Sequence, residues 1–405
     1  MKAKTILLAI LTVSALSSLT LAEWTEPVPV TEINTEFADW TPFLSFDGLS
    51  LYFARGRTSS YYHFRIFEAT REVPYGPFTS VNQVFSSGGQ HVFGPWVSPD
   101  NLRMYYHAEI ESQNRWELKV SERASVNNPW PLGAGISEIN QLGKLHIATL
   151  TADELIIIFG SYDIPNGSGG YDLWMATRPD RYSPFGSVTN LAEINTAANE
   201  VCPSVSPDGL ALIFQSNRNG DWQLFKATRQ SRTEPFGNIE ILPILEIPGY
   251  TNQHPSLSSD GSALYFIRLL DNDISKGDIY VSYNPYMVAV RRIEKAIAEK
   301  LDALDKVNAA LEKEWVAYDA LQELLESGDY GDLKKGDIIT AMQKVFSAIQ
   351  HQELAKKTLD KSIEKLEDSL AALGWQPPAP EPPEPEPPAP VPPIIPPSPP
   401  VPPSP

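Results

Sequence analysis

The chain has a single cysteine, Cys202, among its 405 residues. One cysteine excludes an internal disulfide, and inside an apolar segment it is most simply a small buried side chain. Apolar runs long enough to cross a membrane are also absent after the N-terminal segment. Basic residues are few, with 32 Lys and Arg against 50 Asp and Glu and a net charge of −18. So acidic a surface repels phosphate backbones, which argues against nucleic acid as a partner.

The N-terminal segment has the parts of a secretory signal peptide. Lys2 and Lys4 precede an apolar run, and a small-residue cleavage site ends at Ala22. We therefore expect residues 1–22 to be removed and the protein to be periplasmic or extracellular.

An acidic turn residue recurs along the chain at nearly constant spacing. The intervals are 53, 53, 55 and 52 residues between Asp47, Asp100, Asp153, Asp208 and Asp260. A proline stands five residues before four of these acids, and an apolar segment of strand length follows each turn. A repeat of this length that holds four strands is typical of propeller blades.

Counting the repeats predicts five blades within residues 23–284. The fifth unit ends after its third strand, whereas segment 28–34 resembles the fourth strand of another unit, at 188–195. We therefore expect the N-terminal strand to complete the last blade and close the ring. Closure of this kind removes exposed sheet edges.

The apolar period changes from two to seven at residue 285. Two long segments within 285–375 have this period, which predicts an antiparallel helical hairpin or coiled coil. An intramolecular hairpin is favoured, and self-association through it is the alternative. Residues 376–405 contain 18 prolines and should form a disordered proline-rich tail. The predicted fold class is an all-β five-bladed β-propeller, followed by an antiparallel α-helical hairpin and that tail.

The repeat motifs resemble those of a known family. The turn SPDG is followed by an apolar strand, and the third and fourth units contain GGYDLWMATR and NEVCPSVSPDGLALIFQSNRNG. These motifs are similar to the TolB-type, WD40-like β-propeller repeat of bacterial envelope proteins, over about residues 24–283. The second unit departs most, because Asn101 replaces the turn glycine. The resemblance implies residence outside the cytoplasm and a binding role, and it names no ligand.

Polar residues are expected to converge at the rim of the channel where the inner strands begin. The alignment of repeats places eight candidate ligand-binding residues there: Asp39, Gln90, His91, His146, Asn199, Glu200, Gln253 and His254. Exposed loop tyrosines are secondary candidates: Tyr61, Tyr62, Tyr162 and Tyr171.

Asp39 and Glu200 occupy the same position in two blades that are not neighbours. Two carboxylates across a cleft suit glycoside cleavage, but acids at a repeated position also suit a structural role. The sequence contains no G-x-S-x-G, no H-E-x-x-H and no phosphate-binding glycine loop after a strand.

We therefore expect a recognition or scaffold protein that is not an enzyme, has neither metal nor cofactor, and binds a protein or glycan of the cell envelope. The alternative is a carbohydrate-active hydrolase or lyase that uses Asp39 and Glu200.

Two further sets of repeated residues predict structural contacts. The five turn acids should accept hydrogen bonds within their own turns. An arginine that ends the third strand should link strands in four units: Arg71, Arg123, Arg178 and Arg229.

Overall fold

The structure is a computed structural model that describes residues 24–56, 63–74, 76–85, 91–110, 115–242, 247–270, 273, 276–331 and 333–372. The predicted signal peptide and the predicted proline-rich tail lie outside the described residues.

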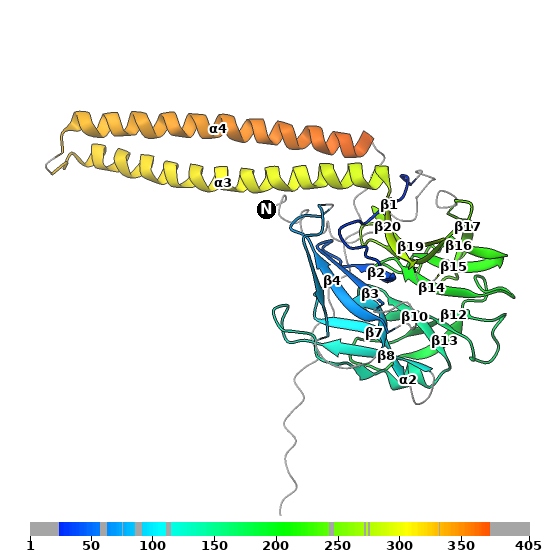
Figure 1. Cartoon of the computed structure of the whole chain (residues 1–405). Helices are drawn as coiled ribbons and strands as arrows, with labels where there is room; N and C mark the ends of the chain where they lie inside the picture. Colours follow the sequence, from blue (N-terminus) through cyan, green and yellow to red (C-terminus); the bar gives the residue numbers. More distant parts are fainter. Residues whose placement is uncertain are drawn as a thin grey trace, which may run out of the picture.

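Five four-stranded antiparallel sheets are arranged as a ring, and two long helices follow them (Figure 1). The predicted fold class, a five-bladed β-propeller followed by a long helical region, is confirmed.

The first four blades follow the sequence repeats. Blade 1 comprises β2 (Asp39–Leu44), β3 (Ser50–Arg55), β4 (Arg65–Thr70) and β5 (Ser80–Gln83). Blade 2 comprises β6 (Val92–Val97), β7 (Arg103–Ile110), β8 (Arg115–Glu122) and β9 (Ala134–Gly135), with the short helix α2 (Ser137–Asn140) after it. Blade 3 comprises β10 (Leu145–Leu150), β11 (Ile156–Ser161), β12 (Asp172–Thr177) and β13 (Gly186–Asn190). Blade 4 comprises β14 (Glu200–Val205), β15 (Ala211–Asn219), β16 (Asp221–Thr228) and β17 (Gly237–Ile241).

Blade 5 joins the two ends of the propeller. It comprises β18 (Tyr250–Leu257), β19 (Ala263–Leu270), β20 (Asp278–Tyr283) and, as its outer strand, β1 (Val28–Pro29). β1 pairs antiparallel with β20, so that Val28 lies opposite Val281. The inner strand of blade 5 also contacts the inner strand of blade 1, which closes the ring.

The second strand of each blade is buried on both faces. In β11 all six residues are buried, because a blade is packed between two neighbouring blades. Ile158 of β11 and Phe214 of β15 belong to one apolar cluster, which lies between blades 3 and 4. This packing explains why these segments read as continuous apolar runs in the sequence and not as alternating ones.

The repeated turn contacts predicted from the sequence are confirmed. In blade 4, Asp208 Oδ1 accepts hydrogen bonds from Ser206 Oγ (2.5 Å) and from the backbone N–H of Leu210 (2.9 Å). The same pair of contacts is made by the turn acids of the other blades, at Asp47, Asp100, Asp153 and Asp260.

The repeated arginines also have the predicted structural role. Arg229 Nε donates to the Gly209 carbonyl at 2.7 Å, and its guanidinium lies 4.3 Å from the centre of the Phe236 ring. Equivalent contacts are made by Arg71, Arg123 and Arg178.

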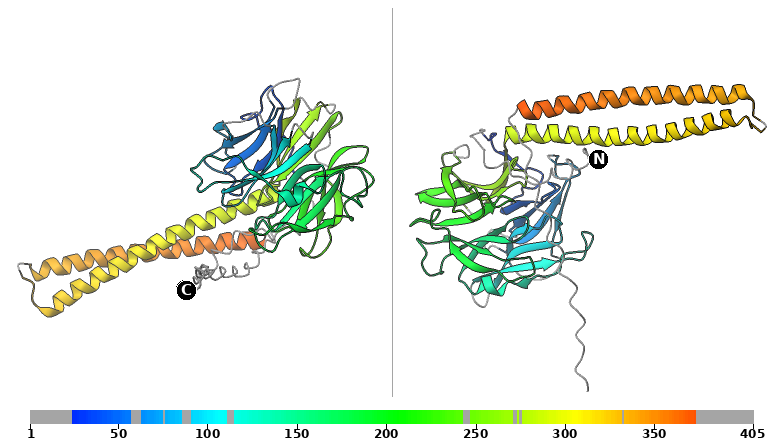
Figure 2. Two further views of the ribbon diagram at one scale, coloured as in Figure 1. Left: turned by 90° about the horizontal axis from the view of Figure 1, so that it is seen from below. Right: turned by 180° about the vertical axis from the view of Figure 1, so that it is seen from behind.

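Two long helices form a hairpin that projects from the propeller (Figure 2). α3 (Pro285–Ser327) begins directly after β20, and its N-cap residue Asn284 accepts a hydrogen bond from the backbone N–H of Met287. α4 (Lys335–Ala372) runs back beside α3. Their shared core lies mainly in the half nearest the propeller, at Val290, Ile297, Ile363 and Leu370. Among the described residues, no helix is both long and apolar enough to cross a membrane.

Candidate functional site

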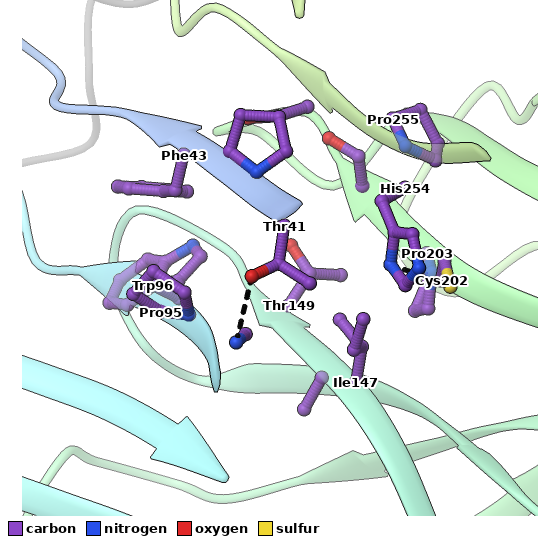
Figure 3. A pocket seen from close by; sticks show the side chains of 15 residues that line it. Thr41, Phe43, Pro95, Trp96, Ile147, Thr149, Cys202, Pro203, His254 and Pro255 are labelled. Atoms are coloured by element: carbon purple, nitrogen blue, oxygen red, sulfur yellow. Dashed lines mark hydrogen bonds between the residues drawn. The ribbon is translucent and has the colours of Figure 1, made fainter. Parts of the chain in front are cut away.

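Each inner strand contains a β-bulge at the same place. The pairing register shifts between Trp40 and Phe43 in β2, and at equivalent places in the other four inner strands. In four strands the residue before the proline has a positive φ: Thr41 (48°), Gly94 (62°), Cys202 (52°) and His254 (52°). For a residue other than glycine this conformation costs of order 1–3 kcal/mol, and such strain is concentrated at functional sites. All four residues line the same cavity (Figure 3).

That cavity is the central channel of the propeller. Inner-strand residues of all five blades line it, and its volume is about 30 Å³. This volume has room for roughly one or two water molecules. A ligand larger than water must therefore bind at an end of the channel and not inside it.

Imidazoles and the only thiol meet beside the channel. Cys202 Sγ lies 3.3 Å from His254 Nδ1 and 3.8 Å from His146 Nδ1. Cys202 is buried, as predicted, but its neighbours are polar side chains as well as apolar ones. His107 is fully buried, and neither of its ring nitrogens has a hydrogen-bond partner among the described residues. Neither Cys202 nor His107 is among the residues that the sequence predicts for the site.

Aromatic rings from three blades surround these imidazoles at the mouth, which we define as the channel end where the inner strands begin. Between ring centres, Trp40 lies 5.0 Å from His254, and Tyr171 lies 5.6 Å from His146. Phe93 and Trp116 lie 4.5 Å apart at ring centres. All four aromatic side chains are only partly buried. We call Trp40, Phe93, Trp116 and Tyr171 the mouth cluster.

All five histidines of the propeller belong to one network of ring contacts. His91 connects to His63 at 6.3 Å, to Trp116 at 4.6 Å and to Phe93 at 6.1 Å between ring centres. Phe93 in turn contacts His107 and His146, and His146 contacts His254. Residues more than 150 positions apart are thus gathered at one end of the channel.

The four inner imidazoles are neutral at physiological pH. Burial lowers the pKa of His146 to about 4, and burial with a small contribution from His146 lowers that of His107 to about 3. The pKa of His254 falls to about 3 and that of His91 to about 4, again chiefly because of burial. A neutral imidazole has one donor and one acceptor nitrogen, so the mouth presents hydrogen-bonding groups without positive charge.

The two candidate carboxylates are held inside their own blades. Asp39 has no exposed side-chain surface, and its Oδ1 lies 2.6 Å from Arg55 Nε. Its Oδ2 accepts hydrogen bonds from the backbone N–H and the hydroxyl of Thr35. Burial raises the pKa of Asp39, while Arg55 and Thr35 oppose that shift by stabilising the ionised form.

Glu200 repeats this arrangement in blade 4. It is also fully buried, accepts from the backbone N–H of Thr196 at 2.8 Å, and lies 3.2 Å from Arg218 Nη2. Ser216 Oγ donates to the same carboxylate at 2.7 Å. Each carboxylate bonds a threonine four residues earlier and an arginine of the next strand. Each therefore stabilises the interior of its own blade. Neither is open to a substrate in this structure.

The other predicted site residues lie at or near the mouth. His91, His146 and His254 belong to the ring network described above. Asn199 Oδ1 accepts from the backbone N–H of Tyr171 at 2.9 Å and so joins the loop before β12 to blade 4. Gln253 is buried, with its Nε2 3.3 Å from Thr251 Oγ1. Three other candidates lie outside the described residues: Tyr61, Tyr62 and Gln90.

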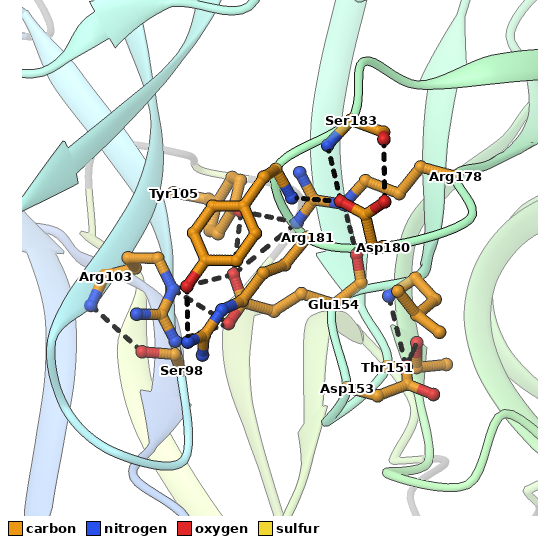
Figure 4. A network of polar contacts seen from close by, with 12 residues as sticks. Ser98, Arg103, Tyr105, Thr151, Asp153, Glu154, Arg178, Asp180, Arg181 and Ser183 are labelled. Atoms are coloured by element: carbon orange, nitrogen blue, oxygen red, sulfur yellow. Dashed lines mark hydrogen bonds and ion pairs between the residues drawn. The ribbon is translucent and has the colours of Figure 1, made fainter. Parts of the chain in front are cut away.

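A second polar network lies at the opposite end of the channel, between blades 2 and 3 (Figure 4). Glu154, with a buried side chain, accepts from Arg103 Nη2 at 2.7 Å and from the Tyr105 hydroxyl at 2.8 Å. Arg178 Nη2 lies 3.6 Å from the same carboxylate. Every carboxylate oxygen here has a partner, so this network serves the packing of two blades and not a ligand.

Within the described ranges, no group of three or more His, Cys, Asp or Glu side chains is arranged to hold a metal ion.

Comparison with known proteins assigns no family to the chain. No family model and no curated sequence matches the chain. Among solved structures, TolB from Acinetobacter baumannii is similar with a TM-score of 0.36 and 16% identity over 58% of this chain. The chain covers about half of that protein, 53% of its length. An endo-arabinase from Bacteroides thetaiotaomicron has a TM-score of 0.44 and 12% identity, with 64% of this chain and 97% of that one covered.

These comparisons correct one prediction, that the chain is not an enzyme. Besides the endo-arabinase, the similar structures include a GH43 glycoside hydrolase, the Bacteroides ovatus xyloglucan PUL GH43B and prolyl endopeptidases. An enzymatic propeller is therefore the class that most of these structures represent. With identities of 10–12% and TM-scores of 0.31–0.44, their likeness to this chain is one of fold, and it transfers neither a substrate nor a catalytic residue.

Proposed function

We propose that the propeller binds a neutral glycan at the mouth of its channel. The observation that supports this proposal most directly is the mouth cluster, in which partly exposed aromatic rings surround imidazoles that have no charge. The channel beneath is too narrow for a sugar ring, so the ligand would lie across the mouth.

The chemistry of the mouth suits a sugar better than an ion. One face of a pyranose or furanose ring consists largely of C–H groups, which pack against an aromatic face, while the hydroxyl groups need donors and acceptors. Trp40 and Trp116 provide aromatic faces. The hydroxyl group of Tyr171, a partly exposed side chain, can donate to and accept from a sugar hydroxyl group. The net charge of −18 disfavours polyanionic glycans.

Calorimetry with neutral oligosaccharides and the whole protein would test this proposal. Trp116→Ala should weaken binding at least tenfold, because it removes one aromatic face of the mouth. Trp315→Ala is the matched control, since that tryptophan lies on α3 away from the mouth and is 42% exposed. Equal affinities for the Trp116→Ala variant and the unmodified protein, or no binding of any oligosaccharide, would refute the proposal.

Glycoside cleavage is the second candidate function, and one carboxyl group favours it. Burial raises the pKa of Asp278, which begins β20 at the same end of the channel as the mouth. A carboxyl group that retains its proton to higher pH can act as a general acid. Asp39 and Glu200 are less suited, because each is enclosed in an ion pair with arginine.

Product analysis of any bound oligosaccharide would test for cleavage. Asp278→Asn should abolish turnover and leave affinity within about threefold, because the amide keeps the shape of the carboxyl group and cannot donate an acidic proton. Turnover that survives this substitution would exclude Asp278 as the acid.

We also propose that the protein is exported and belongs to the TolB-type propellers, with a cell-envelope partner. The signal-peptide pattern of residues 1–22 and the SPDG repeats support this part of the proposal. Self-association through the hairpin stays a prediction, for which Trp315 and Phe346, each 42% exposed, are the candidate contacts. Cell fractionation and light scattering of the whole protein test the two statements separately.

A further inference from the structure

A larger hollow lies beside the mouth, between blades 4 and 5. Its volume is about 350 Å³, which falls within the range of small-molecule sites. It is formed by the start of β16, the end of β17 and the segment that leads into β18. The described residues that line it include Asp221, Trp222, Leu242, Ile247, Tyr250 and Asn252. We call this hollow the blade 4/5 cleft.

Trp222 lies between the cleft and the mouth. On one side it lines the cleft, and on the other it packs against the cluster of Ile147, Val201 and Cys202 at the channel. Tyr171 of the mouth cluster packs against that same cluster. A ligand that extends from the mouth past Trp222 therefore enters the cleft.

The cleft combines exposed apolar side chains with a single exposed carboxylate among the described lining residues. Tyr250 and Ile247 are each 39% exposed, unusually open for large apolar side chains. Asp221 is an exposed carboxylate at the edge of the cleft. Arg268 bonds Asn252 Oδ1 at 3.1 Å, and its guanidinium lies 4.8 Å from the centre of the Tyr280 ring, so it is already engaged within blade 5.

We propose that the blade 4/5 cleft is a second sugar subsite, and that the ligand is consequently an oligosaccharide chain that spans the mouth and the cleft. This inference rests on the proposed glycan binding at the mouth. Tyr250 and Trp222 supply aromatic faces for a sugar ring, and Asp221 accepts hydrogen bonds from its hydroxyl groups. The negative charge of Asp221 selects against acidic sugars, in agreement with the neutral mouth.

The length of the oligosaccharide distinguishes binding at the mouth alone from binding at both the mouth and the cleft. We would measure affinities of the whole protein for arabino-oligosaccharides and xylo-oligosaccharides of increasing length by calorimetry. Affinity should rise by at least tenfold from the shortest bound chain to longer ones. Tyr250→Ala should remove that gain and leave the affinity for the shortest chain unchanged, whereas Trp116→Ala should weaken every length.

Two further variants guard against misfolding. Asp221→Asn changes an exposed side chain and should weaken only the longer chains, by several-fold. Tyr182→Ala is the matched control for Tyr250→Ala, because Tyr182 is 81% exposed on another propeller loop.

The outcomes separate the subsite from the proposed function. If Tyr250→Ala and Asp221→Asn leave the gain with chain length intact, or weaken all lengths equally, the subsite is refuted while glycan binding at the mouth stands. If no oligosaccharide of either series binds the unmodified protein, both proposals fail.

Discussion

Three asparagines, of which Asn140 and Asn195 are buried, make the same structural contacts in three blades. Each uses its side-chain amide to bond both the N–H and the carbonyl of one residue in a third strand: Asn34 with Ile279, Asn140 with Leu118, and Asn195 with Leu173. These amides satisfy backbone groups where the fourth strand leaves the sheet. Each of the three asparagines directly follows an isoleucine. The dipeptide Ile-Asn therefore recurs in the sequence as Ile33-Asn34, Ile139-Asn140 and Ile194-Asn195.

Asn195→Ala should lower the free energy of unfolding by about 2 kcal/mol, because it leaves the buried N–H of Leu173 without a partner. It also removes one of the two donors to the Leu173 carbonyl, which still accepts from the backbone N–H of Leu191. Urea denaturation would measure the loss. Asn219→Ala is the control, since that exposed amide makes a single side-chain contact with Gln223 and its removal should change stability by less than about 0.5 kcal/mol. Equal stability of the two variants would show that the Asn195 contacts contribute nothing.

The same repeat explains the limit of the carboxylate prediction. Thr35 to Asp39 and Thr196 to Glu200 have the same spacing after an Ile-Asn pair, and both acids bond the threonine four residues earlier. A repeated motif of this kind is a signal for structure, and it was readable in the sequence. The enclosing arginines, Arg55 and Arg218, could be identified only from the fold, because they come from the neighbouring strand.

Among the elements, the turn between the first two strands of blade 3 differs from the same turn in the other four blades. The residue after the turn acid has a positive φ in every blade. In blade 3 this residue is Glu154, whereas in the other blades it is Gly48, Asn101, Gly209 or Gly261. A glutamate at a φ of 61° is strained. Its ion pairs with Arg103 and Arg178 compensate for that strain, and the pair with Arg103 joins blade 3 to blade 2.

Glu154→Gln should destabilise the protein by about 3 kcal/mol, because it leaves two arginines facing a neutral group in a buried network. The backbone strain is the same in both proteins, so the difference reports the network. Glu234→Gln, an exposed change in a loop of blade 4, is the matched control and should have little effect. Chemical denaturation of both variants would decide, and a loss below about 1 kcal/mol for Glu154→Gln would contradict the role described here.

The elements themselves were largely predictable, and the site only in part. Turn acids, prolines and apolar strands recur with the blade, so local sequence specifies the number of blades and the contacts of the repeated aspartates and arginines. The mouth depends on contacts such as Phe93 with Trp116 and Cys202 with His254, which join different blades or different strands. The repeat alignment places His254 at the rim. Phe93, Trp116 and Cys202 read locally as ordinary strand residues, so only the closed ring reveals that they belong to the site.

For the molecule as a whole, the neutral imidazoles predict sensitivity to acid. Their pKa values are lowered in the folded protein, to about 3 or 4 against 6.5 for a free side chain, so the unfolded chain binds more protons between these values. Stability is therefore complete above about pH 6.5 and falls as the pH decreases toward 4. Carboxyl groups with raised pKa values, such as Asp278, act in the opposite direction.

His107→Leu isolates the contribution of one imidazole. The melting temperature of the unmodified protein should fall between pH 7 and pH 5, and the fall should be smaller in the variant, because one fewer proton is taken up on unfolding. His351→Gln, on an exposed turn of α4, should leave the pH dependence unchanged. Identical pH dependence in all three proteins would show that buried imidazoles do not control acid stability.

The position of β20 determines how the helical arm is attached. α3 leaves β20 after a single residue, Asn284, and β20 lies between β19 and β1. A force applied to the far end of the helical hairpin would therefore act on β20. This strand is hydrogen-bonded on both sides, so it is harder to detach than an edge strand. The force would pass through β1 to the first residues of the propeller and through β19 to the ring, so the attachment would resist tension along the arm.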